Sequence, residues 1–214
     1  MEELLFFDIE VFKYQSMVVF KNLNGETVRI FTNSLDGLGE YVDKNILTEK
    51  GFHKLEDFIR DKTLVGYNNY HYDDYILYAM CIGLKQKFIK RWNDSIIKKG
   101  SKVNMKKVNV CKTLDCFQQI DVSNPSLKKI EGNMGRMIYE SNIDFNVDRK
   151  LTPRENLETV KYCEYDVLQT IEIYKLRKNS YFDVKDTLIE MIPAHLKDWA
   201  YSWNTTSIIV TILA

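Results

Sequence analysis

Apolar residues fill most positions from Leu4 to Phe12, and two acids interrupt the second half of this segment. The segment is rich in β-branched and aromatic residues and too short for a helix of its own, so we predict a buried β-strand. Strand side chains alternate between two faces. One face is apolar and consists of Leu5, Phe7, Ile9 and Val11. The other face ends in the two acids and consists of Leu4, Phe6, Asp8 and Glu10.

The two acids of this strand, Asp8 and Glu10, would project side by side, about 7 Å apart. Burying one unpaired carboxylate is costly, and a second like charge beside it raises the cost. A divalent cation between them would explain the pair, because hard cations take carboxylate oxygens as ligands. The alternative is a strand end that is open to solvent, where two acids need no partner.

Strand and helix patterns alternate along the rest of the chain. Residues 16–21 and 27–31 read as strands joined by the hairpin signal Asn24-Gly25, so we expect an antiparallel three-stranded start. The further predicted elements are a short helix within 34–43, helices over 51–61, 72–83 and 126–134, and strands over 63–67 and 110–117. This order predicts an α/β fold, a mixed β-sheet flanked by α-helices.

A strong helix start precedes the longest helical stretch. Thr152 is the predicted N-cap, Pro153 takes the first helical position, and Glu155 completes a capping box. We expect this helix to break or bend before a second stretch that runs to about residue 178. Two further segments, 189–196 and 199–214, follow and are punctuated by Pro193.

Size and charge limit the functional classes. The chain has 214 residues and is 45% hydrophobic, which suits one α/β domain with an appendage. Lys and Arg number 30 and Asp and Glu number 30, so the total charge does not indicate nucleic-acid binding. Any such surface must come from local segregation of charge.

One segment, 85–112, does segregate charge. It contains a single acid, Asp94, and the interleaved aromatic residues Phe88 and Trp92. Its basic residues are Lys85, Lys87, Lys90, Arg91, Lys98, Lys99, Lys102, Lys106, Lys107 and Lys112. Two interpretations stay open: a solvated, mobile insertion, or a basic arm for phosphate contacts and base stacking.

The cysteines and the chain start indicate the compartment. Four cysteines form no C-x-x-C pair, and the three histidines do not cluster with them, so zinc is not expected. Reduced thiols fit a cytoplasmic protein better than disulfides do. The first residues lack the basic start of a signal peptide, and no apolar run reaches membrane-spanning length. We therefore expect a soluble intracellular protein with no membrane partner.

Three more acidic positions stand at element boundaries. Asp73 would lie in the first turn of a helix, where an acid commonly complements the helix dipole. Tyr162 and Asp166 are four residues apart and share one helix face. Asp115 lies on a predicted strand, and we interpret it as structural.

Together these residues resemble the three motifs of DEDD-type 3′–5′ exonucleases, the proofreading domains of DNA polymerases and their relatives. The matching motifs, in order and spacing, are Asp8-Ile9-Glu10, Asn69-x-x-Tyr72-Asp73 and Tyr162-x-x-x-Asp166. The tyrosine marks the DEDDy subclass, since the histidine subclass would need His where Lys161 stands. The resemblance covers roughly residues 1–178 and implies an RNase H-like fold, with the acids meeting at one end of the central sheet.

The resemblance also implies a role for each motif residue in holding two Mg²⁺ or Mn²⁺ ions. Asp8 would bridge both ions, and Glu10 and Asp166 would complete the tighter site. Asp73 would hold the second ion, largely through water. Tyr162 would orient the attacking water, because a phenol with its usual pKa near 10 is a weak base at neutral pH. Two such ions about 3.5–4 Å apart can generate the nucleophile and stabilise the departing 3′ oxygen.

Substrate contacts follow from the same resemblance. Asn69 and Tyr72 would touch the terminal nucleotides. The motif spacing favours Asp73 over Asp74, and one residue on a helix turns a side chain by about 100°. Val11 stands where the family often has Thr, so one expected substrate hydrogen bond is missing or replaced. The nearby aromatic residues Tyr67, Tyr70 and Tyr72 could stack on bases or could lie in the core.

The expected domain organisation is an exonuclease domain over 1–180, followed by 181–214. The second segment is expected to be a C-terminal linker or the start of a polymerase domain. Residues 199–208 are similar to the segment that leads into the polymerase domain of some bacteriophage-type DNA polymerases. A split polymerase subunit and a truncated chain are both compatible with this.

The leading hypothesis is therefore a metal-dependent 3′–5′ exonuclease that acts on the 3′ end of single-stranded DNA. It would serve as the proofreading module of a polymerase domain or subunit, with host cytoplasm as the location if the protein is viral. One alternative keeps the chemistry and takes RNA as substrate. A second is a non-catalytic nucleic-acid-binding module with an RNase H-like fold.

Overall fold

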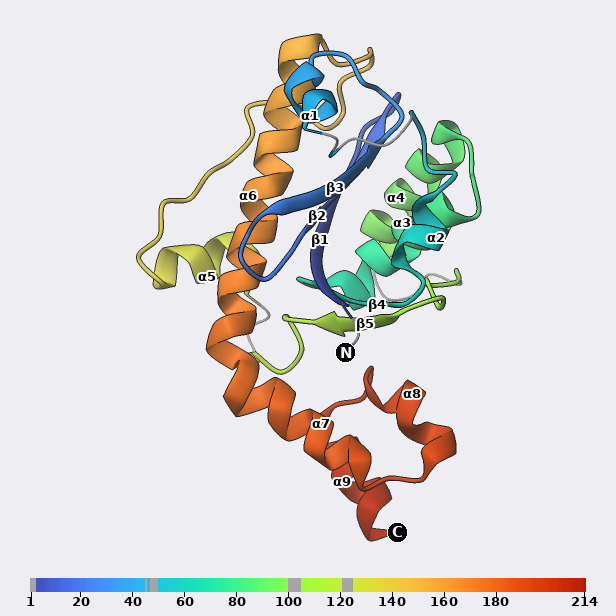
Figure 1. Ribbon diagram of the computed structural model, residues 1–214, viewed down its shortest axis with the longest axis vertical. Coiled ribbons are helices and arrows are strands. Elements are labelled where there is room, and N and C mark those ends of the chain that lie inside the picture. Colours follow the sequence, from blue (N-terminus) through green and yellow to red (C-terminus); the bar gives the residue numbers. More distant parts are fainter. Residues whose placement is uncertain (1–2, 45, 47–49, 100–104, 121–124) are drawn as a thin grey trace.

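A computed structural model describes residues 3–44, 46, 50–99, 105–120 and 125–214. Its centre is a five-stranded sheet with the strand order β3-β2-β1-β4-β5 (Figure 1). The strands are β1 (Glu3–Val11), β2 (Ser16–Lys21), β3 (Thr27–Thr32), β4 (Lys62–Gly66) and β5 (Lys112–Asp115). β1, β2 and β3 pair antiparallel, whereas β1, β4 and β5 run parallel. The predicted antiparallel start and the mixed sheet are both confirmed.

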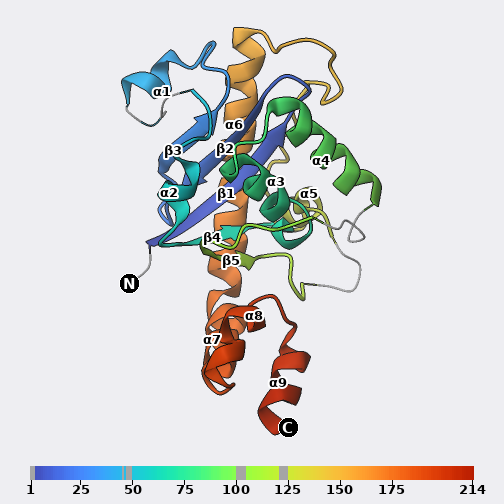
Figure 2. The same cartoon turned by 90° about the vertical axis from the view of Figure 1, so that its right-hand side faces the viewer.

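Helices flank the sheet, with α2, α3 and α4 on one side and α6 on the other (Figure 1, Figure 2). The α-helices are α1 (Gly39–Asp43), α2 (Leu55–Ile59), α3 (Asp73–Cys81), α4 (Gln86–Lys99), α5 (Leu127–Asn133), α6 (Pro153–Arg177), α7 (Asp183–Glu190), α8 (Lys197–Ala200) and α9 (Thr205–Leu213). Shorter helical turns are η1 (Asn69–His71), η3 (Lys178–Phe182) and η4 (Ala194–Leu196). The protein therefore has the predicted α/β architecture, which is compatible with an RNase H-like fold.

The central strand β1 sends alternate side chains into two separate hydrophobic cores. Its apolar face, which includes Phe7, packs with α3 and α4. On the other face, Phe6 lies in a core shared with α6 and meets the ring of Tyr174 edge to face, with 5.2 Å between the centroids. The period-2 assignment of this strand is confirmed. Because Asp8 and Glu10 share the face of Phe6, both acids are directed toward α6.

Helix α6 starts as the sequence predicts. The Thr152 hydroxyl accepts from the backbone N–H of Glu155 at 3.3 Å, and the Glu155 carboxylate accepts from the backbone N–H of Thr152 at 2.8 Å. This reciprocal pair satisfies two N–H groups that have no partner within the helix. The predicted break before residue 178 is wrong, because α6 runs for 25 residues without interruption.

The continuity of α6 has a physical cause in its sequence. No Pro or Gly follows Pro153 within the helix, and its buried residues recur every three or four positions along the sheet. Members of this buried stripe are Val160, Cys163, Val167, Ile171 and Tyr174. The change of direction comes only at the π-helical turn η3, after which α7 begins.

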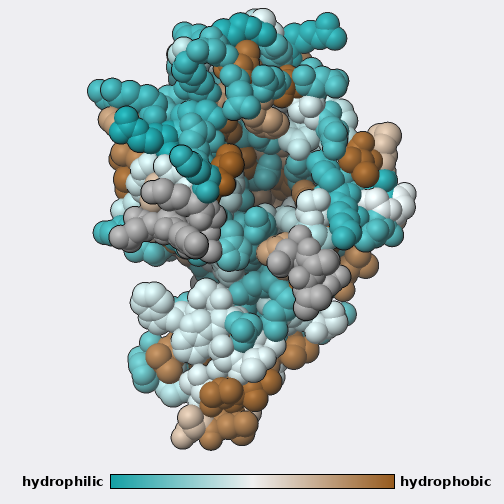
Figure 3. All heavy atoms as spheres, turned by 180° about the vertical axis from the view of Figure 1, so that it is seen from behind, coloured by the Kyte–Doolittle hydropathy of each residue, from teal (hydrophilic) through white to brown (hydrophobic). Residues whose placement is uncertain are grey.

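The C-terminal helices gather around a small core of their own, below the sheet in Figure 1. This core consists of Ile189, Ile192, Ala200 and Ile208. Lys185 ties it to the body of the protein, since its buried ammonium donates to Gln118 Oε1 at 2.6 Å and to the Tyr201 carbonyl at 2.7 Å. Figure 3 shows apolar side chains at the lower end, where Ile209, Val210 and Leu213 of α9 are exposed.

The basic segment 85–112 contributes helix α4 and the start of β5. α4 is packed on the fold through Ile89 and Ile96, which are buried, so a solvated insertion is the wrong description of this helix. Lys107 is also engaged, with its ammonium 5.1 Å from the ring centroid of Tyr75. Residues 100–104, including Lys102, and the side chain of Lys99 lie outside what the structure describes.

No helix in the described ranges is both long enough and apolar enough to span a bilayer.

Candidate metal centre

Three carboxylates converge between β1 and α6. Asp8, Glu10 and Asp166 each offer an oxygen, and these oxygens all lie within 4.8 Å of one another. β1 places the first two on one face, and the packing of α6 against that face brings the third to them. Glu10 and Asp166 are only 8% and 7% exposed, while Asp8 is partly open to solvent. Such a group matches the oxygen ligands that hard divalent cations prefer.

The burial of this acidic cluster, Asp8, Glu10 and Asp166, makes its negative charge unfavourable. Desolvation, followed by repulsion from Asp166, raises the pKa of Asp8 to about 7. Desolvation, with repulsion from Asp8 and Asp166, raises the pKa of Glu10 well above its ordinary value. Carboxylates whose charged forms are this costly gain much from a cation placed between them.

Lys128 of α5 supplies one positive charge to the acidic cluster. Its ammonium forms an ion pair with Asp166 and lies 3.5 Å from the buried Glu131 carboxylate. It also lies 4.8 Å from the ring centroid of Tyr162. Burial raises the pKa of Asp166, and the hydrogen bond from Lys128 opposes that shift. Sequence reasoning missed Lys128, because an isolated Lys in a short helix carries no motif.

Replacing Lys128 with Gln is expected to destabilise the metal-free protein by about 1–3 kcal/mol, since a buried carboxylate would lose its charged partner. The same change is expected to tighten Mn²⁺ binding, because a competing positive charge is removed. Thermal melts in EDTA and in a Mn²⁺ titration measure both effects. Lys129→Gln, at the exposed neighbouring position, is the matched control. Equal melts and equal Mn²⁺ midpoints for the two variants would contradict this prediction.

Tyr162 stands one helical turn before Asp166, with its ring partly exposed. Its ring stacks under the Lys128 ammonium, which is the ion-pair partner of Asp166. Burial, with repulsion from Asp166 and Glu10, raises the pKa of this phenol above its ordinary value. The hydroxyl therefore stays protonated at neutral pH and can orient a neighbouring group, which agrees with the positioning role predicted for it.

Cys163 is a second contact that sequence reasoning missed. Its buried thiol donates to a carboxylate oxygen of Asp8 at 3.4 Å. Desolvation, with repulsion from Asp8 and Glu10, raises the pKa of this thiol well above its ordinary value. A neutral thiol packs against Asp8 without adding negative charge. The cysteines Cys81, Cys111, Cys116 and Cys163 are all free thiols.

Asp73 and Asp74 open α3 and have different surroundings. Burial and then repulsion from Asp8 raise the pKa of Asp73 well above its ordinary value. The Asp73 carboxylate is therefore near enough to the acidic cluster to feel the charge of Asp8. It is not a member of the group whose oxygens lie within 4.8 Å. The Asp74 carboxylate instead accepts from Asn69 Nδ2 and from the Thr113 hydroxyl, both at 2.9 Å. The geometry favours Asp73 as the acid available to a second ion.

Alanine at these adjacent positions should separate the two roles. Asp73→Ala is expected to lower cleavage by about 10²-fold or more, because a metal ion contributes several kcal/mol of transition-state stabilisation. Its melting temperature should not fall, since a buried like charge is removed. Asp74→Ala should lower stability by about 1–3 kcal/mol for each buried partner left unpaired. The opposite pattern, measured by nuclease assay and thermal melts, would contradict the assignment.

The structure does not place Asn69 where a substrate could reach it. Its side chain is 0% exposed, and its amide nitrogen donates to Asp74, while its amide oxygen is buried and accepts no hydrogen bond from the described residues. Gly66 makes this packing possible, because a Cβ there would lie 2.8 Å from the Cβ of Asn69. The predicted contact between Asn69 and a terminal nucleotide has no support in this geometry, and its role here is to hold Asp74.

Tyr70, Tyr67 and Asp115, near the start of α3, form hydrogen bonds with the backbone. Tyr70 is buried, and its hydroxyl donates to the Thr113 carbonyl at 2.7 Å, so it is a core residue. The Tyr67 hydroxyl donates to the Pro125 carbonyl. Asp115 accepts backbone N–H groups of Asn68, Tyr70 and Phe117, which fits the structural role predicted for it.

An open cavity of about 530 Å³ leads to the acidic cluster. It is lined by Glu10 and Val11 of β1, by Tyr72, by α4 and by Phe145 of the loop before α6. Tyr72 donates its hydroxyl to Asn93 of α4, which fixes its ring at the cavity wall. Tyr72 therefore lies at a wall of this cavity, and its contact with a terminal nucleotide stays a prediction.

Comparisons of the sequence with protein-family models and with curated proteins found no match.

Proposed function

We propose that the protein is a divalent-metal-dependent 3′–5′ exonuclease of the DEDDy type, acting on the 3′ end of single-stranded DNA. The observation that carries this proposal is the convergence of Asp8, Glu10 and Asp166 around one point. The three motifs contribute to one neighbourhood, because Asp8 and Asp73 repel each other and Lys128 both pairs with Asp166 and lies over the ring of Tyr162.

The donor set fits two hard cations. Asp8, Glu10 and Asp166 would hold one ion, and Asp8 with Asp73 would hold the second. Bound ions would lower the pKa of a coordinated water and offset charge on the leaving 3′ oxygen. Burial and repulsion from Asp166 raise the pKa of Asp8 to about 7, and a cation beside Asp8 would oppose both effects.

The remaining residues position the reacting groups. The Tyr162 hydroxyl, one helical turn before Asp166 on α6, can donate to or accept from a water on the open side of the acidic cluster. Tyr72 forms a wall of the cavity at Glu10, where the last nucleotide of a strand would lie. The Lys128 ammonium, which pairs with Asp166, limits charge repulsion while the site is empty of substrate.

We also propose that this nuclease serves a polymerase domain or subunit as its proofreading module. Support comes from the resemblance of residues 199–208 to a segment that leads into polymerase domains. The exposed apolar side chains of α9 stand on the same C-terminal helices, where such a partner would attach.

Digestion of 5′-labelled single strands tests the proposal. DNA and RNA oligonucleotides of one sequence are incubated with the protein in Mg²⁺, in Mn²⁺ and in EDTA. The proposal expects a ladder that shortens from the 3′ end of DNA, requires metal and is lost in EDTA. Faster digestion of RNA than of DNA would show that the substrate is RNA. Tight binding of the strands without shortening would show that the protein is a binding module and not a nuclease.

A further inference from the structure

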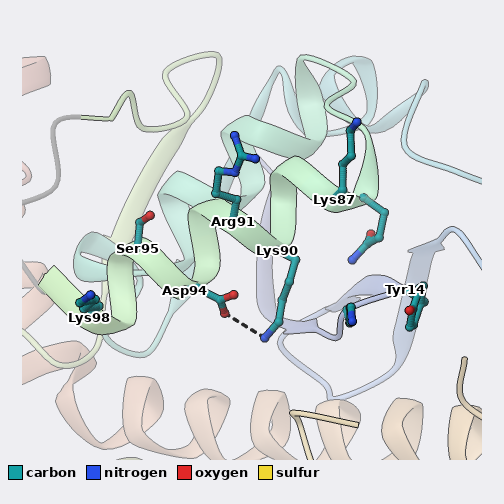
Figure 4. A pocket seen from close by; sticks show the side chains of 9 residues that line it. Tyr14, Lys87, Lys90, Arg91, Asp94, Ser95 and Lys98 are labelled. Atoms are coloured by element: carbon teal, nitrogen blue, oxygen red, sulfur yellow. Dashed lines mark ion pairs between the residues drawn. The ribbon is translucent and has the colours of Figure 1, made fainter. Parts of the chain in front are cut away.

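The solvent-facing side of α4 is strongly basic. Lys87, Lys90, Arg91 and Lys98 line a cavity of about 650 Å³ together with Gln86, Asp94 and Ser95 of α4 and with Lys13 and Tyr14 of the β1–β2 connection (Figure 4). Among the described residues that line this cavity, Asp94 is the only acid, and it pairs with Lys90 at 2.9 Å. Because the whole chain has no net charge, this concentration of positive charge is local.

The cavity beside α4 continues into the cavity at the acidic cluster. Lys90, Asp94 and Lys98 line both of them. One surface path therefore runs from Glu10 along α4 to Tyr14. We refer to this path as the α4 groove, lined on its basic side by Lys87, Lys90, Arg91 and Lys98. A strand whose end lies at the acidic cluster meets the α4 groove next.

The fold itself does not need these charges. α4 is held by its other face, where Ile89 and Ile96 are buried and Trp92 stacks on Tyr78 with 6.2 Å between ring centroids. Within the described part of the chain, no carboxylate forms an ion pair with Lys87, Arg91 or Lys98. Lys87 and Arg91 lie over the ring of Phe88, 5.0 and 5.5 Å from its centroid, but no carboxylate offsets the repulsion among the three cations, which a polyanion would relieve.

We propose that the α4 groove binds the phosphodiester backbone of the single strand whose 3′ end is cleaved. This inference rests on the proposed function and names the path of its substrate. Lys87 and Lys98 are eleven residues apart, or about 16 Å along the helix axis. At a spacing of about 3.4 Å per nucleotide, this length matches roughly five stacked nucleotides, and fewer if the strand is extended. The partially exposed ring of Tyr14 lies at the far end, where a base can stack on it.

Backbone binding of this kind is independent of sequence and strongly dependent on salt. The proposed site then has two parts of opposite charge. The acidic cluster receives metal ions, and the α4 groove receives the phosphates that follow. An acidic protein segment is the competing occupant for a basic groove, and the experiment below distinguishes it.

The test neutralises the α4 groove in the full-length chain. Lys87, Lys90, Arg91 and Lys98 are replaced by Gln, and the matched control replaces four exposed lysines elsewhere, Lys44, Lys150, Lys175 and Lys178. Both sets are combined with Asp8→Asn to prevent cleavage, and binding of a fluorescent 20-nucleotide single strand is measured from 50 to 200 mM salt. Circular dichroism confirms that each variant is folded.

We expect the groove variant to bind more weakly and the control to bind as the parent does. Each lost phosphate contact lowers the slope of log affinity against log salt by about 0.7, so four contacts give about 2.8. Over the 50–200 mM range this equals about a 50-fold smaller change in affinity. The loss should grow with strand length up to about five nucleotides and then level off. An equal slope for groove variant and control would overturn the inference.

A gain-of-binding variant gives independent support. Asp94→Asn removes the one acid of the groove and frees Lys90, so tighter strand binding with a steeper salt slope is expected. Weaker binding, or displacement of the strand by polyglutamate at equal charge concentration, would overturn the inference in favour of an acidic protein partner. Because binding is measured without cleavage, these results are separate from the digestion assay. A groove that binds strands in a protein that digests none would refute the nuclease and leave only the binding of single strands by the α4 groove.

Discussion

Asparagine in place of Asp8 is expected to reduce cleavage by about 10³-fold or more and to make the metal-free protein more stable. In the proposed site Asp8 would be a ligand of both ions, and loss of several kcal/mol of metal-derived stabilisation would correspond to that factor. Stability should rise in EDTA because the substitution removes a desolvated charge that Asp166 repels. Asparagine keeps an oxygen that can accept from the Cys163 thiol. Nuclease assay and thermal melting measure the two effects.

Asp57→Asn is the matched control for this change. It makes the same chemical substitution at a side chain that is 81% exposed on α2. It should leave both cleavage and melting temperature nearly unchanged. A fall in melting temperature for Asp8→Asn in EDTA would mean that Asp8 supports the fold rather than a metal site. Cleavage at the parental rate would refute the proposed chemistry.

Addition of Mn²⁺ is expected to raise the melting temperature, and to raise it more at pH 8 than at pH 5. A ligand that binds only the folded state at a hundred times its dissociation constant adds about 2.7 kcal/mol. For a chain of this size that is about 5–10 °C. The measurement is a set of melts in buffers from pH 5 to pH 8, each with Mn²⁺ and with EDTA.

The pH dependence follows from Asp8. Its pKa is about 7 in the folded protein and near 3.8 in an exposed chain, so the folded state binds more protons between these values. Stability without metal is therefore lost as the pH rises from about 4 to about 7. Metal requires the deprotonated carboxylates, so its stabilising effect grows over the same range.

Burial also raises the pKa of Asp74 to about 7, so Asp74 too makes the stability fall as the pH rises. A metal at the acidic cluster would not remove this contribution. The informative quantity is thus the difference between the Mn²⁺ and EDTA melts at each pH. Asp8→Asn should shrink this difference. An equal Mn²⁺ effect at pH 5 and pH 8 would show that binding does not involve these acids.

The sequence predicted those features that local periodicity determines. The alternation of β1 assigned Phe7 and Phe6 to opposite cores correctly, and the capping box placed the start of α6 at Thr152. The alternation of β1 alone was enough to predict that Asp8 and Glu10 lie side by side on one face. Asp166 could be added only through motif resemblance, because no local rule says which helix face meets which strand.

The misses were features that only tertiary packing determines. Lys128 reaches Asp166 because α5 packs beside α6, and nothing in the residues around Lys128 signals that approach. Asn69 matched a motif, yet close packing on Gly66 turned its side chain into the core. The predicted break in α6 was wrong because its buried residues recur every three or four positions and no Pro or Gly interrupts the helix after Pro153.

Helix α6 also has a mechanical consequence. It is a straight rod that carries Asp166 in its middle and the C-terminal helices at its end, eleven residues further on, or about 16 Å away. A tilt of about 5° about that end would shift Asp166 by about 1.4 Å. That shift is enough to disrupt coordination by carboxylates. A force that displaces α7–α9 would therefore tilt α6 and move Asp166 relative to Asp8 and Glu10.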